Sequence, residues 1–231
     1  MAGSSPRMRH RLALLLPILA ALALGTAPVA QAQTPSRSPS EATTGATAPV
    51  ARLNDALLDL MRRGGQEPNG ARLQRFLPVM RDVFDLDAAL QIAAAPYFEQ
   101  AGEAERRQAL DAFTRRSAAQ YLDRFDSYNG ESFTIDGERA GPRGTTLVDT
   151  TLSRPRKPPV RLTYVLRPAG KDWAGKDGAG KDWRILDVLA KGMVSQLAAQ
   201  RSEFQAPLRN EGLAGLTRDL NANADRLLGG A

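Results

Sequence analysis

The sequence predicts an α+β fold in which helices come before and after a four-stranded antiparallel sheet. Hydrophobic residues recur at helical spacing up to about residue 125 and alternate with polar residues between about residues 132 and 189. Helical spacing returns from about residue 194. Separate runs of helices and of strands are typical of α+β domains, whose helices pack against the sheet.

Two helices are predicted at the start of this domain. The first begins near residue 50 and ends at the glycine pair 64–65. The second covers residues 71–83, and Pro78 inside it predicts a kink or a break, because proline removes a helical hydrogen bond.

Two short helices and one long helix are predicted next. The segment 85–87 is expected to be the turn and N-cap of an alanine-rich helix that ends near residue 94, and Pro96 begins another short helix. The long helix covers residues 103–125. Acidic residues precede arginines by four positions at 103/107 and 111/115, which predicts ion pairs on its exposed side.

Four strands follow, with short turn-rich links that predict an antiparallel meander. Leu162 and Tyr164 alternate with polar neighbours, as half-buried strand residues do. A Lys-Asp repeat of period five at residues 171–182 is interpreted as a lengthened, solvated hairpin loop, with a binding role as the alternative. The strands are predicted at residues 132–138, 145–153, 159–167 and 182–189.

Two terminal helices are predicted, one over residues 194–204 and one over 213–227, with Pro207 and Gly212 between them.

Arg201 is the charge of most interest in these helices. It follows Leu197 by four positions and precedes Phe204 by three, so we expect it on the apolar helix face. We favour an ion pair with Asp187 in the preceding strand. A snorkelling side chain and a contact with a lipid phosphate are the alternatives.

The first 32 residues have the pattern of a Sec-type signal peptide. Three arginines precede an apolar run at residues 12–24, and the triplet AQA at residues 30–32 suits a processing site. The run would form a helix of about 20 Å, short of a hydrocarbon core of about 30 Å. We therefore expect cleavage after residue 32 and a periplasmic protein; an uncleaved anchor is the alternative.

The expected order along the chain is a signal peptide at residues 1–32, a disordered leader at 33–49 and one domain at 50–228. The leader is rich in serine, threonine, proline and alanine and has no large apolar residue.

The composition favours a binding protein over an enzyme. Of 231 residues, 42% are hydrophobic and 24% charged, which fits a globular domain. There is no cysteine, and His10, the one histidine, lies in the signal peptide. The mature chain thus lacks the commonest general base and transition-metal ligands. Acidic pairs at 85/87 and 123/126 lie near helix ends, so we assign no catalytic residue, metal or cofactor. The formal net charge of +6 falls to +3 without residues 1–32, because 28 basic residues then face 25 acidic ones, and this mild, interspersed charge does not suit a nucleic-acid partner.

The sequence resembles the MlaC family of periplasmic lipid-binding proteins, also called toluene-tolerance proteins. The likeness spans about residues 50–228. At residues 192–195 the family's Gly-Val-Ser-Leu is replaced by Gly-Met-Val-Ser, and the helix that follows resembles the hopanoid-associated HpnM branch. The matching segments are WRILDV at 183–188, Gly192 and QRSEF at 200–204, FLPV at 76–79, VFD at 83–85, LDAF at 110–113, Tyr121, and FDSY at 125–128.

The resemblance implies a shell of helices and sheet around an apolar cavity that holds acyl chains. Pattern alone does not separate such a cavity from a filled core. We predict its wall from helix stripes and strand faces: Met80, Phe84, Leu90, Phe98, Phe113, Tyr121, Leu147, Leu162, Tyr164, Val188, Val194 and Leu197.

The resemblance also implies a function. Family members carry lipid between the inner and outer membranes, so we expect a monomeric shuttle for phospholipid or hopanoid. The implied partners are an inner-membrane ABC transporter complex with an MCE-domain protein and an outer-membrane lipoprotein or porin complex. Burying acyl chains at about 0.8 kcal/mol per CH₂ makes unassisted release slow. Docking partners would speed it without any catalytic group. A periplasmic adaptor with a filled core and a small hydrolase or isomerase are the alternatives.

Overall fold

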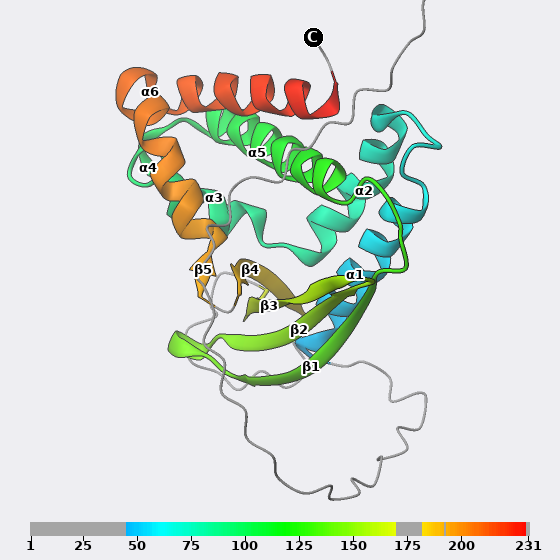
Figure 1. Cartoon of the computed structure of the whole chain (residues 1–231). Helices are drawn as coiled ribbons and strands as arrows, with labels where there is room; N and C mark the ends of the chain where they lie inside the picture. Colours follow the sequence, from blue (N-terminus) through cyan, green and yellow to red (C-terminus); the bar gives the residue numbers. More distant parts are fainter. Residues whose placement is uncertain (1–44, 170–181, 192, 230–231) are drawn as a thin grey trace, which may run out of the picture. The chain divides into compact units, whose positions relative to one another are not determined.

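The computed structural model describes residues 45–169, 182–191 and 193–229 (Figure 1). It confirms the α+β class, with helices before and after an antiparallel sheet. The expected signal peptide and most of the Lys-Asp repeat lie outside the described residues. The helices are α1 (Thr47–Arg62), α2 (Asn69–Val83), α3 (Leu86–Ala94), α4 (Tyr97–Gln100), α5 (Glu103–Arg124) and α6 (Gln196–Leu228).

The sheet is a meander, with each strand antiparallel to the next in sequence. It has five strands where four were expected, because the two residues after the last turn also pair with β4. The strands are β1 (Ser132–Ala140), β2 (Thr146–Arg154), β3 (Lys157–Pro168), β4 (Trp183–Ala190) and β5 (Val194–Ser195), and the 3₁₀ turn η1 (Pro142–Gly144) joins β1 to β2.

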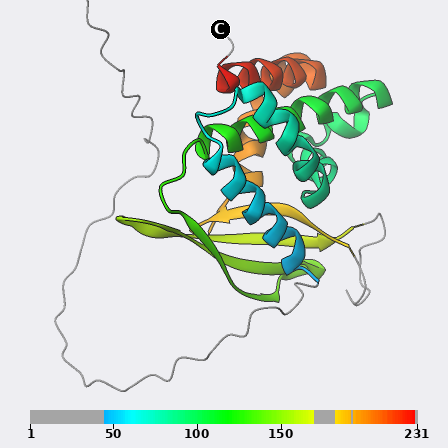
Figure 2. The same cartoon turned by 90° about the vertical axis from the view of Figure 1, so that its right-hand side faces the viewer.

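Helices cover one face of this sheet (Figures 1 and 2). Register places Val148, Tyr164 and Val188 side by side on three neighbouring strands. Val148 and Tyr164 are fully buried in the same core cluster as the helix residues Leu53, Met80 and Phe113. This face of the sheet therefore meets the helical layer.

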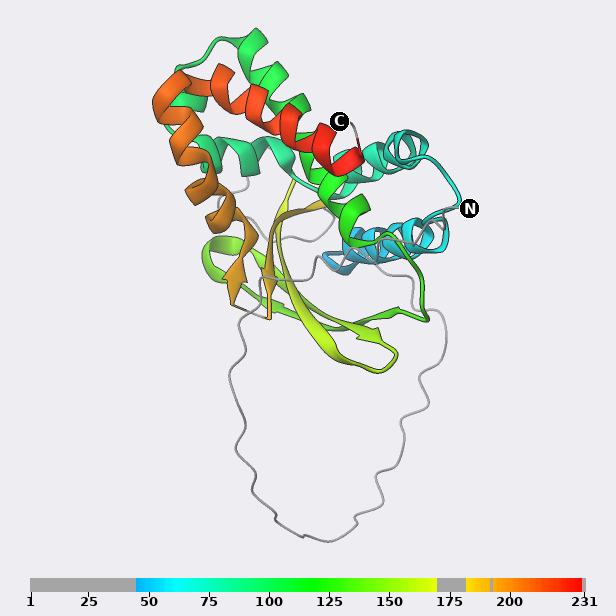
Figure 3. The same cartoon turned by 45° about the horizontal axis from the view of Figure 1, so that its top comes forward.

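Three helix predictions need adjustment. α1 begins at Thr47, inside the segment expected as a leader, because Ala46 and Pro49 are already buried. α2 runs through Pro78 without a break. In α6 the interruption falls at Glu211 and Gly212, whose backbone angles are not helical, whereas Pro207 stays within the helix. The helix changes direction there, so its second half lies along α5 (Figure 3).

The expected N-cap at Asp85 is confirmed, since its Oδ1 accepts a hydrogen bond from the Ala88 N–H at 3.2 Å. The ion pair between Glu103 and Arg107 is also present. The expected pair between positions 111 and 115 is wrong, because Arg115 instead reaches Asp225 on α6 at 2.6 Å. Arg115 thus links α5 to α6, whereas the i,i+4 spacing predicted an ion pair within α5.

The end of α2 is attached directly to β4. The Asp85 N–H donates to the Ile185 carbonyl at 2.8 Å, and Arg184 Nη1 donates to the carbonyls of Arg81 and Asp82 at 2.7 and 2.6 Å. Asp85 also pairs with Arg167 on β3 at 2.6 Å. Because cations are favourable at helix C-termini, Arg184 both satisfies the last carbonyls of α2 and positions the helix against the sheet.

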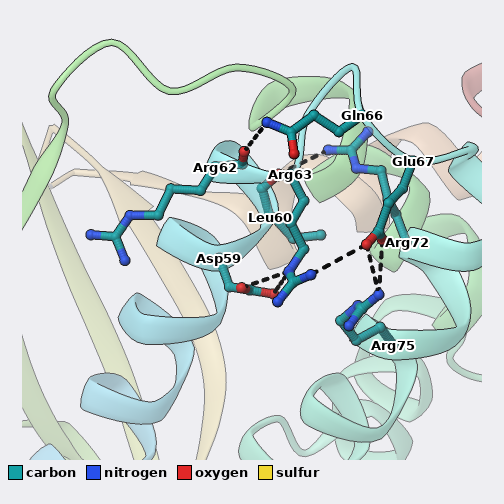
Figure 4. A network of polar contacts seen from close by, with 8 residues as sticks. All are labelled: Asp59, Leu60, Arg62, Arg63, Gln66, Glu67, Arg72 and Arg75. Atoms are coloured by element: carbon teal, nitrogen blue, oxygen red, sulfur yellow. Dashed lines mark hydrogen bonds and ion pairs between the residues drawn. The ribbon is translucent and has the colours of Figure 1, made fainter.

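A buried arginine joins the ends of two other helices. Arg72 is 4% exposed, and its Nη2 donates to the carbonyls of Leu60, at the end of α1, and Phe125, after α5. Asn69 accepts from its Nη1 at 2.9 Å. Burial lowers the pKa of Arg72 from its ordinary value. Figure 4 shows this guanidinium beside the ion pairs that Arg63 and Arg75 make with Glu67.

Candidate functional site

A pocket lies between β4 and the helical layer, where α2, α3, α5 and the start of α6 converge. Its cavity volume is small, about 40 Å³. Ligand pockets usually measure about 300–1,000 Å³, so the pocket is nearly closed in this structure. The lining residues are Met80, Phe84, Leu86, Ala89, Phe113, Ser117, Tyr121, Leu186, Asp187, Val188, Gln196, Leu197 and Gln200.

The structure brings together half of the residues that the sequence suggested for the wall. Six of them line this pocket: Met80, Phe84, Phe113, Tyr121, Val188 and Leu197. Leu90, Phe98, Leu147 and Tyr164 are buried but do not line it.

The other two predicted wall residues lie apart from the pocket. Leu162 is half-buried in β3 and packs against the core. Val194 is 60% exposed in the short strand β5. A period-two pattern identifies two faces of a strand but not which face meets solvent at so short an edge strand.

Sequence reasoning missed the polar part of the lining. Ser117 lies midway between Phe113 and Tyr121 at intervals of four, and Gln200 precedes Phe204 by four. Both therefore occupy the same helix stripes as aromatic residues that the pattern had identified. A polar residue within an apolar stripe was the signal that could have found them.

Tyr121 is at the centre of an aromatic cluster on the pocket wall. Its ring lies 5.7 Å from Phe76, 6.0 Å from Phe84 and 6.0 Å from Phe125, between ring centroids. Burial raises the pKa of the Tyr121 hydroxyl above its ordinary value, and the charge of Arg124 opposes this only in part. Tyr121 is thus a neutral side chain held by packing, and it contributes apolar surface to the pocket.

Asp187, on the WRILDV segment of β4, organises the pocket's edge. Its carboxylate accepts hydrogen bonds from the Ser195 hydroxyl at 2.6 Å, the Leu197 N–H at 2.9 Å and the Val188 N–H at 2.7 Å. Ser195 in turn caps α6 by accepting from the Ala198 N–H at 2.9 Å. Asp187 therefore fastens the start of α6 to β4 beside the pocket.

The expected ion pair between Arg201 and Asp187 is wrong. Arg201 is exposed, and Asp187 is engaged with the start of α6 instead. The buried face of the first half of α6 runs through Gln200, Phe204 and Leu208. Arg201 lies about 100° around the helix from Gln200, which turns it away from that face.

The buried cation at this helix pair is Arg116 on α5. Its side chain is 4% exposed and its Nη2 donates to both carboxylate oxygens of Glu203, at 2.7 and 2.8 Å. The guanidinium also lies 5.9 Å from the centre of the Phe204 ring. The motif QRSEF thus contributes its acid, and not its arginine, to the buried pair.

The lining offers apolar contact and a few hydrogen-bonding groups. Among the described residues that line it, none is an arginine or a lysine, and the one carboxylate, Asp187, is already bonded three times. In the part of the chain that the structure describes, no cluster of acidic or histidine side chains could hold a metal ion. No helix within those same residues is long and apolar enough to cross a bilayer.

An α+β shell with an apolar pocket between its helices and its sheet defines a class of ligand-binding protein. The chain belongs to the family described as MlaC protein, whose model matches residues 51–222. Among curated proteins, none is significantly similar to the sequence.

Among the solved structures with a similar fold is the phospholipid-binding protein from Ralstonia solanacearum, determined in complex with a phospholipid. The superposition has a TM-score of 0.61 with 19% identical residues, and it covers 80% of this chain and 99% of the other. A likeness at this level of identity establishes a common fold.

Proposed function

We propose that the protein binds a membrane lipid, a phospholipid or a hopanoid, and carries it through the periplasm between the inner and outer membranes. The observation that supports this best is the apolar pocket between β4 and the helices. Membership of the MlaC family and the phospholipid bound by the Ralstonia solanacearum protein point the same way. The protein would act by binding and release, without a chemical step.

Loading requires the pocket to widen. A cavity of about 40 Å³ has room for only a few water molecules, and two acyl chains need far more room. We place the movement between β4 and the first half of α6, because Asp187 and the short strand β5 are the main polar connections there. Helices can slide against a sheet where packing is apolar and few hydrogen bonds hold them.

Release would depend on partners that open this gap. Each buried CH₂ contributes about 0.8 kcal/mol, so a loaded lipid leaves slowly by itself. An inner-membrane ABC complex with an MCE-domain protein and an outer-membrane lipoprotein complex are the partners that we propose, with a Sec-type signal delivering the protein to them.

Two matched substitutions test the pocket. Leu186 and Leu162 are both half-buried strand leucines that pack against the core, but only Leu186 lines the pocket. Leu186→Trp should fill the pocket and abolish lipid content, while Leu162→Trp should keep it. Lipids extracted from protein purified from its own periplasm would be identified and counted by mass spectrometry, and circular dichroism would verify folding.

Equal lipid content in the two folded variants would contradict the proposed site. Wild-type protein that carries no lipid, and takes none from vesicles, would instead support an adaptor whose surface binds another protein.

A further inference from the structure

Uncharged polar groups without partners lie in the wall of the pocket. Ser117 is 5% exposed, and its Oγ is buried without any hydrogen-bond partner among the described residues. Gln200 is 8% exposed, and no hydrogen bond joins its side-chain amide to the described part of the chain. A buried polar group without a partner costs about 1–3 kcal/mol in a folded protein. Among the residues that line the pocket, the Ser117 Oγ is such a group, and the amide of Gln200 beside it is also available for a hydrogen bond. A ligand oxygen bound here would satisfy the serine.

The two side chains come from facing helix turns. α5 and α6 pack together such that Phe113 lies 6.1 Å from Phe204 between ring centroids, and Arg116 binds Glu203 at 2.7 Å. The two helices are therefore antiparallel, so later residues of α5 face earlier residues of α6. One turn beyond Phe113 and Phe204, Ser117 lies opposite Gln200. Both line the same pocket.

The charges around Ser117 and Gln200 argue against an anionic ligand group at this position. The lining has no cation to neutralise a phosphate, and the carboxylate of Asp187 would repel one. A hydroxyl or a carbonyl oxygen meets no such penalty, because the serine hydroxyl and the glutamine amide can each donate to it.

We propose that Ser117 and Gln200 form a hydrogen-bonding site for a neutral oxygen of the bound lipid, either a hydroxyl or an ester carbonyl. This inference rests on the proposed function and adds to it which part of the ligand the pocket interior recognises. The lipid enters with an uncharged oxygen between α5 and α6, and any phosphate stays outside the pocket.

Four single-chain probes of equal length test the site on delipidated full-length mature protein. Octane carries no oxygen, 1-octanol a hydroxyl, methyl octanoate an ester and octyl phosphate a charge. Each would compete with N-phenyl-1-naphthylamine, whose fluorescence reports its displacement. One net hydrogen bond is equivalent to roughly a fivefold change in affinity. The alcohol, the ester or both should bind about fivefold more tightly than octane, and octyl phosphate more weakly than either.

The double variant Ser117→Ala with Gln200→Leu should remove this preference and still bind octane. Gln205→Leu is the matched control, since Gln205 lies on the same helix outside the pocket and donates to the Arg201 carbonyl. It should retain the preference. Equal binding of octane, octanol and ester to the wild type, or tightest binding of octyl phosphate, would overturn the inference alone. Failure of all four probes to displace the dye would overturn the proposed function as well.

Discussion

Two buried arginines, Arg72 and Arg116, illustrate different ways to keep a charge inside this protein. Arg72 is surrounded by backbone carbonyls at the ends of α1 and α5, where the helix dipoles favour a cation. Arg116 relies on one carboxylate, that of Glu203, whose side chain is half exposed. The first arrangement joins helix ends to one another. The second leaves the buried cation dependent on one exposed partner.

This dependence predicts an asymmetry between the two halves of the ion pair. Glu203→Gln should lower the free energy of unfolding by about 1.5–3 kcal/mol, because it removes the anion from a buried guanidinium. Arg116→Met should cost much less, because it removes the charge that needs a partner and keeps an apolar side chain against Phe204. Urea unfolding of both variants measures this. A larger loss in Arg116→Met than in Glu203→Gln would show that the pair itself is strongly stabilising.

At the scale of elements, the sequence predicted most helices and strands because their hydrophobic periods are long and uninterrupted. α5 was placed to within a residue and the four longer strands were found in order. The features missed were set by tertiary contacts. β5 exists because it pairs with β4, and Pro78 is accommodated within α2. Of the two residues expected to separate the terminal helices, only Gly212 does so, because the break needs a positive φ.

The candidate site was harder to predict than the fold for a physical reason. Periodicity shows which side chains are buried. A pocket forms where buried side chains leave a gap between them, and the size of that gap depends on the distance between the helical layer and the sheet. Tyr164 and Val188 are neighbours in the sheet, yet only Val188 lines the pocket. Arg201 was wrongly predicted on the apolar face of its helix. It lies four residues after Leu197 and three before Phe204, and both spacings were taken to define the same face.

The end of α1 lies in close contact with the segment after α5. A Cβ placed on Gly64 would lie 1.5 Å from the carbonyl oxygen of Asp126, so the backbones could not remain in contact. Gly64→Ala should destabilise the protein by at least about 2 kcal/mol, with the two elements forced apart.

Gly70→Ala is the matched control, because Gly70 lies in α2 and a Cβ there has no atom within 4 Å. It should be neutral or stabilise by up to about 1 kcal/mol. Thermal melts of the two variants provide the comparison, and similar midpoints would contradict the close approach at Gly64.

For the whole molecule, the two sides of the pocket are attached to β4 by different contacts. α2 is fastened to β4 by Arg184 and Asp85, and α1 packs against both β1 and β4. On the opposite side of the pocket, the first half of α6 meets β4 through β5 and Asp187. The proposed function requires one of these attachments to open, and we place that opening at the α6 side.

A bound lipid should therefore contribute measurably to the stability of the whole domain. A ligand that binds only the folded state stabilises it by about 2.7 kcal/mol at a hundredfold excess over its Kd. For a domain of this size, this corresponds to a rise in thermal midpoint of roughly 5–10 °C. Delipidated wild-type protein should melt lower by this amount and recover on reloading from phospholipid vesicles.

Leu162→Trp should behave in the same way, because it leaves the pocket open. Leu186→Trp should show one midpoint before and after both treatments, since the tryptophan occupies the space that the acyl chains would fill. A midpoint of Leu186→Trp that still rises with vesicles would place the lipid elsewhere on the protein.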